Sequence, residues 1–348
     1  MTSLLDGLLF VTSLVVVAAI LTRLMMRLKI LAVPNHRSSH DRPVPNGGGV
    51  AIVATTYLGV FALFAMGPYF QTVEMQLLGL GCGSLVIAAV GFLDDAGRVH
   101  NFRAKLAAQL FACGLLLAFD ILIDALPIPF FGSVALGGWK YPVTAIWIVG
   151  ITNIFNFMDG LDGLAAGTAV IVAAAFGLIC FGQAAQFSGI LCFVLAAASL
   201  GLFVFNFPKA KIFMGDVGSQ FLGFVLAAVA VLASGSDASR ISILVMPLLL
   251  FNFIFDTFFT FVRRLFAGEN VTQAHKSHLY QLMNQLGYSH AQVSLFHFAV
   301  ALTQVGGAVA LMQGALPDSA LAFLPFILFQ CGYAALVLRA RRRRERSA

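Results

Sequence analysis

The chain has 348 residues, of which 60% are hydrophobic and only 10% are charged, and its mean hydropathy is +0.92. Soluble domains carry roughly a quarter charged residues, so this composition excludes a soluble globule and indicates a protein of the lipid bilayer. The net charge of +6 comes largely from the basic segment RARRRRER at 339–346. Such a tail is typical of contact with membrane lipids at the anionic headgroups, and we expect no nucleic-acid partner.

Apolar runs long enough to cross a bilayer recur along the whole chain. They are continuous rather than alternating, which favours helices over a barrel. The first run lacks a basic n-region and a clear cleavage site, so we expect a retained helix rather than a signal peptide. The sequence predicts an all-α polytopic membrane protein, with a single transmembrane domain over 1–348. Its eleven expected spans lie near 4–22, 47–66, 74–93, 104–123, 141–158, 163–181, 188–206, 217–234, 241–262, 291–313 and 319–338.

The positive charges divide unevenly between the two sides of these spans. If the N-terminus is periplasmic, all of the 21 Lys and Arg residues except Lys140 and Arg240 fall on the cytoplasmic side. The positive-inside rule therefore predicts a cytoplasmic C-terminus in the bacterial inner membrane. The longest polar stretch, 263–290, becomes a cytoplasmic loop, and 339–348 becomes a basic cytoplasmic tail. The five cysteines form no CxxC pair, so we interpret them as small hydrophobic side chains.

Carboxylates and amides gather on the same cytoplasmic side, beside apolar spans where they are costly and usually functional. Asp94 and Asp95 end a span, and Arg98, Arg103 and Lys105 follow them. Adjacent carboxylates resist joint ionisation unless a cation is near. The pair indicates either an acid/base or cation site beside an anionic substrate, or a solvated helix end with compensating charge.

Two further segments carry oxygen ligands. In NIFNFMDGLDGLAAG, at 153–167, Asn153, Asn156 and Asp159 share a helical face, and Asp162 follows within the same turn. In FNFPKAKIFMGDVGSQFLG, at 205–223, Asn206 and Phe213 precede Asp216. Oxygen donors such as Asn156 and Asp216 suit Mg²⁺, and the lack of a Cys/His cluster here disfavours zinc. Phe213 is either lipid-facing or a ring that stacks on a base.

Basic groups and histidines complete the set. HKSHLYQ, at 275–281, presents His275, Lys276 and His278, which suit phosphate binding unless this is an ordinary basic loop. The first loop holds Arg37 and Arg42 before GGG at 47–49, and these glycines suit either anion binding by backbone amides or close helix packing. Acids for a metal, bases for phosphates and one ring predict a site that joins a charged nucleotide compound to a lipid phosphate.

These motifs resemble the polyprenyl-phosphate N-acetylaminosugar-1-phosphate transferases, a branch of glycosyltransferase family 4 that includes the peptidoglycan translocase. The resemblance covers nearly the whole chain. PNHRSSH, at 34–40, looks most like the branch that initiates O-antigen or related lipopolysaccharide glycans. Two departures concern sugar contacts: the translocase has a lysine shortly before its Gly pair, where this chain has His40, Asp41 and Arg42, and a lysine after its DD, where this chain has Arg98.

The resemblance implies a Mg²⁺-dependent enzyme, with Mn²⁺ as a substitute, that uses a UDP-N-acetylaminosugar and undecaprenyl phosphate. By position, Asp216 and Asn156 match the metal ligands, and Asn206 and Phe213 match the nucleotide-binding positions. Asp94 and Asp95 match the acids proposed as base for the lipid phosphate, and Asp159 and Asp162 match a second acid pair. His275 and His278 match the histidine motif of the family.

Two other classes of protein fit part of the pattern. Asp256 lies within an expected span, as ionisable residues of transporters and lipid flippases do. Most of the other polar groups lie at one face, however, and no inverted repeat is visible. Asp256 could instead pair with Arg263 or Arg264. A lipid-diphosphate hydrolase is the second alternative.

Overall fold

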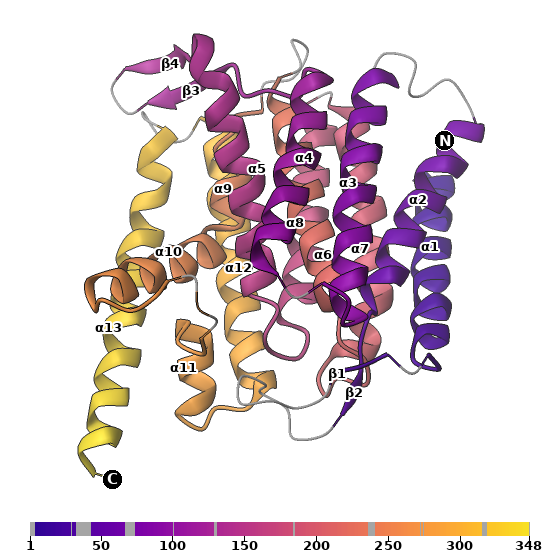
Figure 1. Ribbon diagram of the computed structural model, residues 1–348. Coiled ribbons are helices and arrows are strands. Elements are labelled where there is room, and N and C mark those ends of the chain that lie inside the picture. The colour runs from indigo at the N-terminus through magenta and orange to yellow at the C-terminus, as the bar shows by residue number, and fades with distance from the viewer. Residues whose placement is uncertain are drawn as a thin grey trace.

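The computed structural model describes residues 4–28, 30–32, 43–66, 74–99, 101–128, 131–183, 185–235, 241–271, 273, 275–314 and 319–347. Arg37 and Arg42, which we predict to bind substrate, lie outside the described residues. Ten long helices run roughly side by side as one bundle (Figure 1). They are α1 Leu4–Met25, α2 Gly49–Met66, α3 Glu74–Asp95, α4 Phe102–Ala118, α5 Lys140–Phe157, α6 Leu164–Gly182, α7 Gln186–Asn206, α8 Gly215–Ser234, α12 His290–Met312 and α13 Leu324–Ser347.

The helical membrane architecture agrees with the sequence. Seven of the described helices, α1, α3, α6, α7, α8, α12 and α13, are long and apolar enough to cross a membrane, and α2 is a shorter apolar helix. The chain is therefore a polytopic membrane protein. Each expected span corresponds to a helix except 241–262, and the number of crossings remains a prediction. All five cysteines, each within the described ranges, are free.

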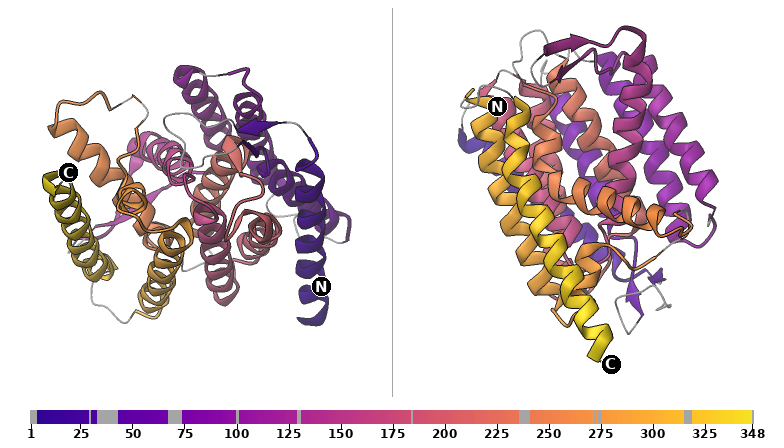
Figure 2. Two further views of the ribbon diagram at one scale, coloured as in Figure 1. Left: turned by 90° about the horizontal axis from the view of Figure 1, so that it is seen from below. Right: turned by 90° about the vertical axis from the view of Figure 1, so that its left-hand side faces the viewer.

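The expected single span at 241–262 is wrong. This range forms two helices, α9 Val245–Leu249 and α10 Phe251–Phe266, and α10 lies across the other helices (Figures 1 and 2). The reason is that α10 is amphipathic: it buries Asp256 and Thr260 on one face and exposes Phe258 and Phe261 on the other. Its last turn also carries two arginines. Averaged over a spanning window, this helix looks apolar, and only its periodicity distinguishes it from a straight span.

Two short hairpins depart from an all-α fold. β1 Leu31–Ala32 pairs with β2 Val44–Pro45, and β3 Ala125–Ile128 pairs with β4 Gly132–Ala135, both antiparallel. They lie at opposite ends of the bundle, and the short helix α11 Leu279–Gln285 and the C-terminus share the end of β1 and β2 (Figure 1). Two 3₁₀ helices, Gly137–Trp139 and Ser319–Phe323, precede α5 and α13.

Helix α8 is the centre of the bundle. Protein buries 94% of its most apolar window, against 22% for α1. Its N-terminal turn meets α2 backbone to backbone, because a Cβ on Gly49 would lie 2.2 Å from the Cα of Gly218. The Gly48 and Gly49 amides donate to the carbonyls of Phe213 and Met214. These glycines therefore serve close helix packing, and the protein's own carbonyls accept from their amides.

Candidate active site

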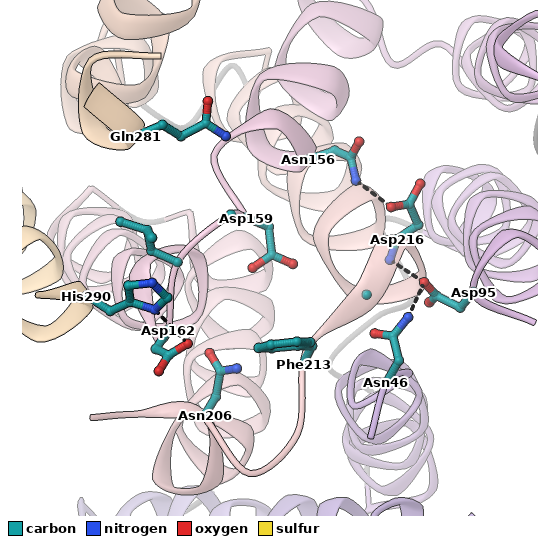
Figure 3. Close-up of a pocket in the computed structure, with 13 residues that line it drawn as sticks. Asn46, Asp95, Asn156, Asp159, Asp162, Asn206, Phe213, Asp216, Gln281 and His290 are labelled. Carbon is teal, nitrogen blue, oxygen red and sulfur yellow. Dashed lines mark hydrogen bonds and ion pairs between the residues drawn. The ribbon is translucent and has the colours of Figure 1, made fainter. Parts of the chain in front are cut away.

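A cavity of about 280 Å³ lies at the end of the bundle that carries β1, β2 and α11 (Figures 1 and 3). Segments distant in the sequence meet there: the end of α3, the α5–α6 and α7–α8 connections, α11 and the start of α12. Seven of the residues predicted for the site line the cavity. The lining consists of Asn46, Asp95, Asn156, Asp159, Gly160, Leu161, Asp162, Asn206, Phe213, Gly215, Asp216, Gln281 and His290.

Asp95 fixes the start of α8. Its Oδ1 accepts from the amide of Asp216 at 2.9 Å, and its Oδ2 accepts from the amide of Val217 at 3.1 Å. Asn46 Nδ2 donates to the same Oδ1 at 3.0 Å. The first amides of a helix lack partners within the helix, so a carboxylate there stabilises its start. Gly215 has φ 76°, and a Cβ on it would lie 2.4 Å from Asp95 Oδ2, so only glycine fits this turn.

Asp216 stands at the centre of a polar network. Asn156 Nδ2 donates to its Oδ1 at 3.1 Å (Figure 3). Lys105 Nζ lies 2.6 Å from Asp216 Oδ2 and also 2.6 Å from Asp94 Oδ2, so one ammonium joins two carboxylates. Asp216 and Asn156, which the sequence separates by 60 positions, therefore lie side by side, as the predicted cation site requires.

A chain of amides continues from Asp216 into the bundle. Gln220 Nε2 donates to Asp216 Oδ2 at 2.9 Å, Gln109 Nε2 donates to Gln220 Oε1 at 3.0 Å, and Asn153 Nδ2 donates to Gln109 Oε1 at 2.7 Å. Buried amides need partners, and this chain satisfies them while fixing the orientation of the Asp216 carboxylate.

Asp159 differs from its neighbours because, among the described residues, no group donates a hydrogen bond to its carboxylate. It faces the cavity from the α5–α6 connection (Figure 3). Burial, and then the negative charges of Asp216 and Asp95, raise the pKa of Asp159 to about 8. This carboxyl can thus gain or lose a proton near neutral pH.

Asp162 and Asn206 join the connections that form the opposite wall. Asp162 Oδ2 accepts from the amide of Ala210 at 3.0 Å, and its Oδ1 lies 3.0 Å from His290 Nδ1. Asn206 Oδ1 accepts from the amide of Gly163 at 2.9 Å, and its Nδ2 donates to the carbonyl of Ile212 at 2.8 Å. Between this wall and Asp216 lies the ring of Phe213 (Figure 3).

The other predicted residues lie outside the cavity lining. Asp94 and Lys105 reach the site only through Asp216. Arg98 and Arg103 are exposed beyond α3 and at the start of α4. His275, Lys276 and His278 also lie outside the lining. Burial, and then the positive charges of His278 and Arg264, lower the pKa of His275 to about 4, so its ring is neutral at pH 7.

Sequence reasoning missed three polar residues of the lining, Asn46, Gln281 and His290. Asn46 lies in PVPNGGG, where the glycines and the preceding arginines were the expected anion-binding groups. Gln281 ends HKSHLYQ, where the histidines and the lysine were the expected ones. His290 begins α12, where Ser289 and Gln292 form a capping box. That box predicts the helix start, but only the fold brings His290 to Asp162.

The side-chain oxygens of Asp216 and Asn156 are of the kind that Mg²⁺ prefers as ligands. In the described part of the chain, no three His, Cys, Asp or Glu side chains form a metal cage. Mg²⁺ needs none, because it usually takes one or two carboxylates and fills its shell with water and substrate phosphate. Lys105 already places a positive charge between Asp94 and Asp216, and burial, followed by the negative charges of Asp216 and Asp95, raises the pKa of Asp159.

Comparisons with known proteins agree with the motifs. Residues 77–234 match the family model described as glycosyl transferase family 4. The chain is 32% identical over 277 residues to the probable undecaprenyl-phosphate N-acetylglucosaminyl 1-phosphate transferase of Bacillus subtilis, covering 79% of this chain and 75% of that protein. It is 31% identical over 347 residues to the decaprenyl-phosphate N-acetylglucosaminephosphotransferase of Mycobacterium tuberculosis H37Rv, covering 92% and 84%.

A third relative matches a shorter stretch of the chain. The phospho-N-acetylmuramoyl-pentapeptide-transferase of Listeria innocua is 37% identical over 196 residues, which cover 53% of this chain and 60% of that protein. The similarity to the Bacillus and Mycobacterium transferases extends well beyond the segment that the family model matches. The chain therefore belongs to glycosyl transferase family 4.

Proposed function

We propose that the protein transfers an N-acetylaminosugar-1-phosphate from a UDP-sugar to undecaprenyl phosphate and releases UMP. The reaction would take place at the cytoplasmic face of the bacterial inner membrane and begin a lipid-linked surface glycan such as an O-antigen. The observation that carries the proposal is the convergence of Asp216, Asn156 and Asp159 beside Phe213 in one cavity at an end of a membrane bundle. The reaction class comes from the Bacillus and Mycobacterium transferases that the chain resembles.

The two ends of the cavity suggest how the donor substrate binds. Asp216 and Asn156 would hold Mg²⁺, which when bound neutralises the diphosphate. Phe213, between this end and the Asp162 wall, would stack on the uracil base, since aromatic rings pack on flat bases. Asp162 and His290 would then meet polar groups of the nucleoside. Asn206 would act indirectly, because the amides and carbonyls of the two connections already occupy its side chain.

The chemistry is a phosphoryl transfer. A phosphate oxygen of the lipid attacks the sugar-bound phosphorus, the bond from that phosphorus to the bridging oxygen breaks, and UMP leaves with the electron pair. Positioning and charge stabilisation carry most of the rate in such reactions. We assign Asp159 as acceptor of any proton on the lipid phosphate, because its pKa of about 8 suits a base near neutral pH. Asp95 is less suited, since three donors occupy its oxygens.

The test is transfer of label from a UDP-sugar into lipid. Membranes containing the protein are incubated with radiolabelled UDP-N-acetylglucosamine and with a panel of other UDP-N-acetylaminosugars. We expect an organic-extractable product and stoichiometric UMP with Mg²⁺, weaker product with Mn²⁺, and none with EDTA. Uptake of label without lipid product would favour a transporter, and phosphate release without a UDP-sugar would favour a hydrolase.

Substitution at Asp216 tests the residue assignment. Asp216→Asn removes the charge that the cation needs, and we expect transfer to fall by roughly 10³-fold or more while the protein still inserts. Asp124→Asn is the matched control, because Asp124 is an exposed carboxylate that pairs with Lys140 at the opposite end of the bundle. Near-normal transfer by Asp216→Asn would refute the metal assignment.

A further inference from the structure

Asp256 is a completely buried carboxylate on the crosswise helix α10. It pairs with neither Arg263 nor Arg264: Arg264 Nε donates to Glu269 at 2.7 Å, and Arg263 donates to the carbonyl of Ser277. Asp256 is also absent from the cavity lining. The predicted arginine pairing is therefore wrong, and a role in contact with substrate has no support in the geometry.

The partners of Asp256 belong to the start of α11. Its Oδ1 accepts from the amide of Leu279 at 2.9 Å, and its Oδ2 accepts from the amide of Tyr280 at 3.0 Å. His278 Nδ1 lies 3.2 Å from Oδ1. Within α10, Thr260 Oγ1 also donates to Oδ1, at 3.2 Å. A carboxylate that receives the first amides of a helix fixes where and at what angle the helix begins.

Helix α11 in turn contacts the loop that carries Asp159 and Asp162. The hydroxyl of Tyr280 donates to the carbonyl of Phe157 at 2.9 Å. The same hydroxyl packs so closely on the loop that a Cβ on Gly160 would lie 2.2 Å from it. Next to Tyr280, Gln281 lines the cavity directly. The first turn of α11 thus forms one wall of the cavity and supports the 158–163 loop, which forms another wall.

We propose that Asp256 is a positioning residue for the transfer reaction: through the amides of Leu279 and Tyr280 it fixes α11, and through the Tyr280 hydroxyl it fixes the 158–163 loop. This inference rests on the proposed function for its catalytic consequence, but its structural part stands on the contacts alone. This series of contacts connects helix α10 with the loop that holds Asp159. The opposite face of α10 exposes Phe258 and Phe261. The positioning role explains why an apolar stretch contains the ionisable residue Asp256, although Asp256 does not line the cavity.

Three substitutions in the full-length protein test the proposal. Asp256→Asn keeps the size of the side chain but places an NH₂ group against a backbone amide. Tyr280→Phe removes only the hydroxyl that reaches Phe157. Thr260→Val is the matched control, because it removes a hydrogen bond to the same carboxylate without touching α11.

Two readouts separate positioning from a loss of stability. We expect Asp256→Asn to lower kcat roughly 10- to 100-fold, as small misplacements near reacting groups do, at an assay temperature where its thermal unfolding curve shows that the protein is still folded. Thr260→Val should stay within about twofold. The double variant Asp256→Asn/Tyr280→Phe should lose no more activity than the more damaging single variant, because residues that act through one contact chain are not additive.

Amide hydrogen exchange provides a readout that does not depend on activity. Exchange over 157–163 and at the start of α11 should accelerate in Asp256→Asn and in Tyr280→Phe, but not in Thr260→Val. Unchanged exchange in Asp256→Asn, or additive losses of kcat, would overturn the proposal. If the wild type transferred no sugar phosphate, the proposed function would fail, while the exchange experiment would still decide whether Asp256 positions the loop.

Discussion

Asp159 is the residue whose chemistry depends most directly on its neighbours. The carboxylates of Asp95 and Asp216 each accept from several donors, whereas Asp159 faces the cavity and accepts from none among the described residues. Burial, and then the charges of Asp216 and Asp95, raise the pKa of Asp159 to about 8. A proton acceptor works only in its deprotonated form, so activity should rise with pH until Asp159 has ionised. A bound divalent cation stabilises the ionised form and lowers the midpoint.

We therefore predict that kcat rises from about pH 6 and levels off by about pH 9, with a midpoint no higher than the pKa of about 8. Steady-state transfer assays at fixed free Mg²⁺ check this. Asp159→Asn should remove this dependence together with most of the activity, and Asp124→Asn should leave the profile unchanged. A flat wild-type profile from pH 6 to 9 would contradict the assignment of Asp159.

His290 is distinctive among the described residues that line the cavity, because it alone has a side chain that can carry positive charge. Its Nδ1 is held by Asp162, so the ring is oriented. We predict that His290→Ala raises the KM for the UDP-sugar about tenfold, the cost of one hydrogen bond to a polar or anionic group, and changes kcat less. His290→Gln, which keeps a donor, should recover part of the loss. An unchanged KM in His290→Ala would place the nucleotide elsewhere.

At the scale of elements, close contacts between backbones fix how α3 and α8 meet. Gly91 on α3 has no room for a side chain: its Cβ would lie 2.7 Å from the backbone of Val217 in α8. Such contacts are common between membrane helices, where small residues let backbones approach closely. Because Val217 directly follows Asp216, this contact also fixes the position of Asp216 relative to α3.

Gly91→Ala should therefore destabilise the protein by about 1–3 kcal/mol, as overpacking does. Gly81→Ala is the matched control on the same helix, since no described atom lies within 4 Å of its added Cβ, and its effect should be small. Thermal unfolding of the purified protein in detergent measures both. Equal stability of the two variants would show that α3 can shift away from α8 at little cost.

The sequence predicted a helix correctly where hydrophobicity alone determines it. The prediction failed where buried polar contacts between distant residues also determine the structure. Runs such as 163–181 and 217–234 became α6 and α8 because nearly their whole length is apolar. The 241–262 stretch did not, since Asn252 pairs with His297 and Gln330 at the break while α10 places its polar face inward. Tertiary partners of this kind lie 45 and 78 positions away along the chain, beyond the reach of a local pattern.

The candidate site was predictable as a set of residue types and less so as a set of contacts. The sequence motifs, together with the gathering of polar residues on one predicted side of the membrane, predicted that Asp216, Asn156 and Asp159 share a site. In the structure all three line the same cavity. The capping of α8 by Asp95 and of α11 by Asp256 could not be predicted, because each joins elements that only the fold brings together. For the same reason His290, at a helix start far from the motifs, was overlooked.

For the whole molecule, the two termini lie at opposite ends of the bundle, and the cavity lies at the end of the C-terminus (Figure 1). The distribution of Lys and Arg predicts that this end is cytoplasmic. Fusions test the orientation: a fluorescent protein at the C-terminus should fluoresce, and alkaline phosphatase inserted between β3 and β4 should be active. Active phosphatase at the C-terminus would reverse the predicted orientation, and with it the side from which nucleotide enters.

The ammonium of Lys105, held equally by Asp94 and Asp216, means that the site carries its own exchangeable counter-ion. A divalent ion arriving there competes with a tethered monovalent one, so its net affinity is a difference between two favourable interactions rather than the full strength of either. If Mg²⁺ binds there as proposed, this competition would disfavour permanent occupancy and would favour arrival and departure of the ion together with a phosphate-bearing ligand. The released lysine would then be free to follow the negative charge that the ligand brings in.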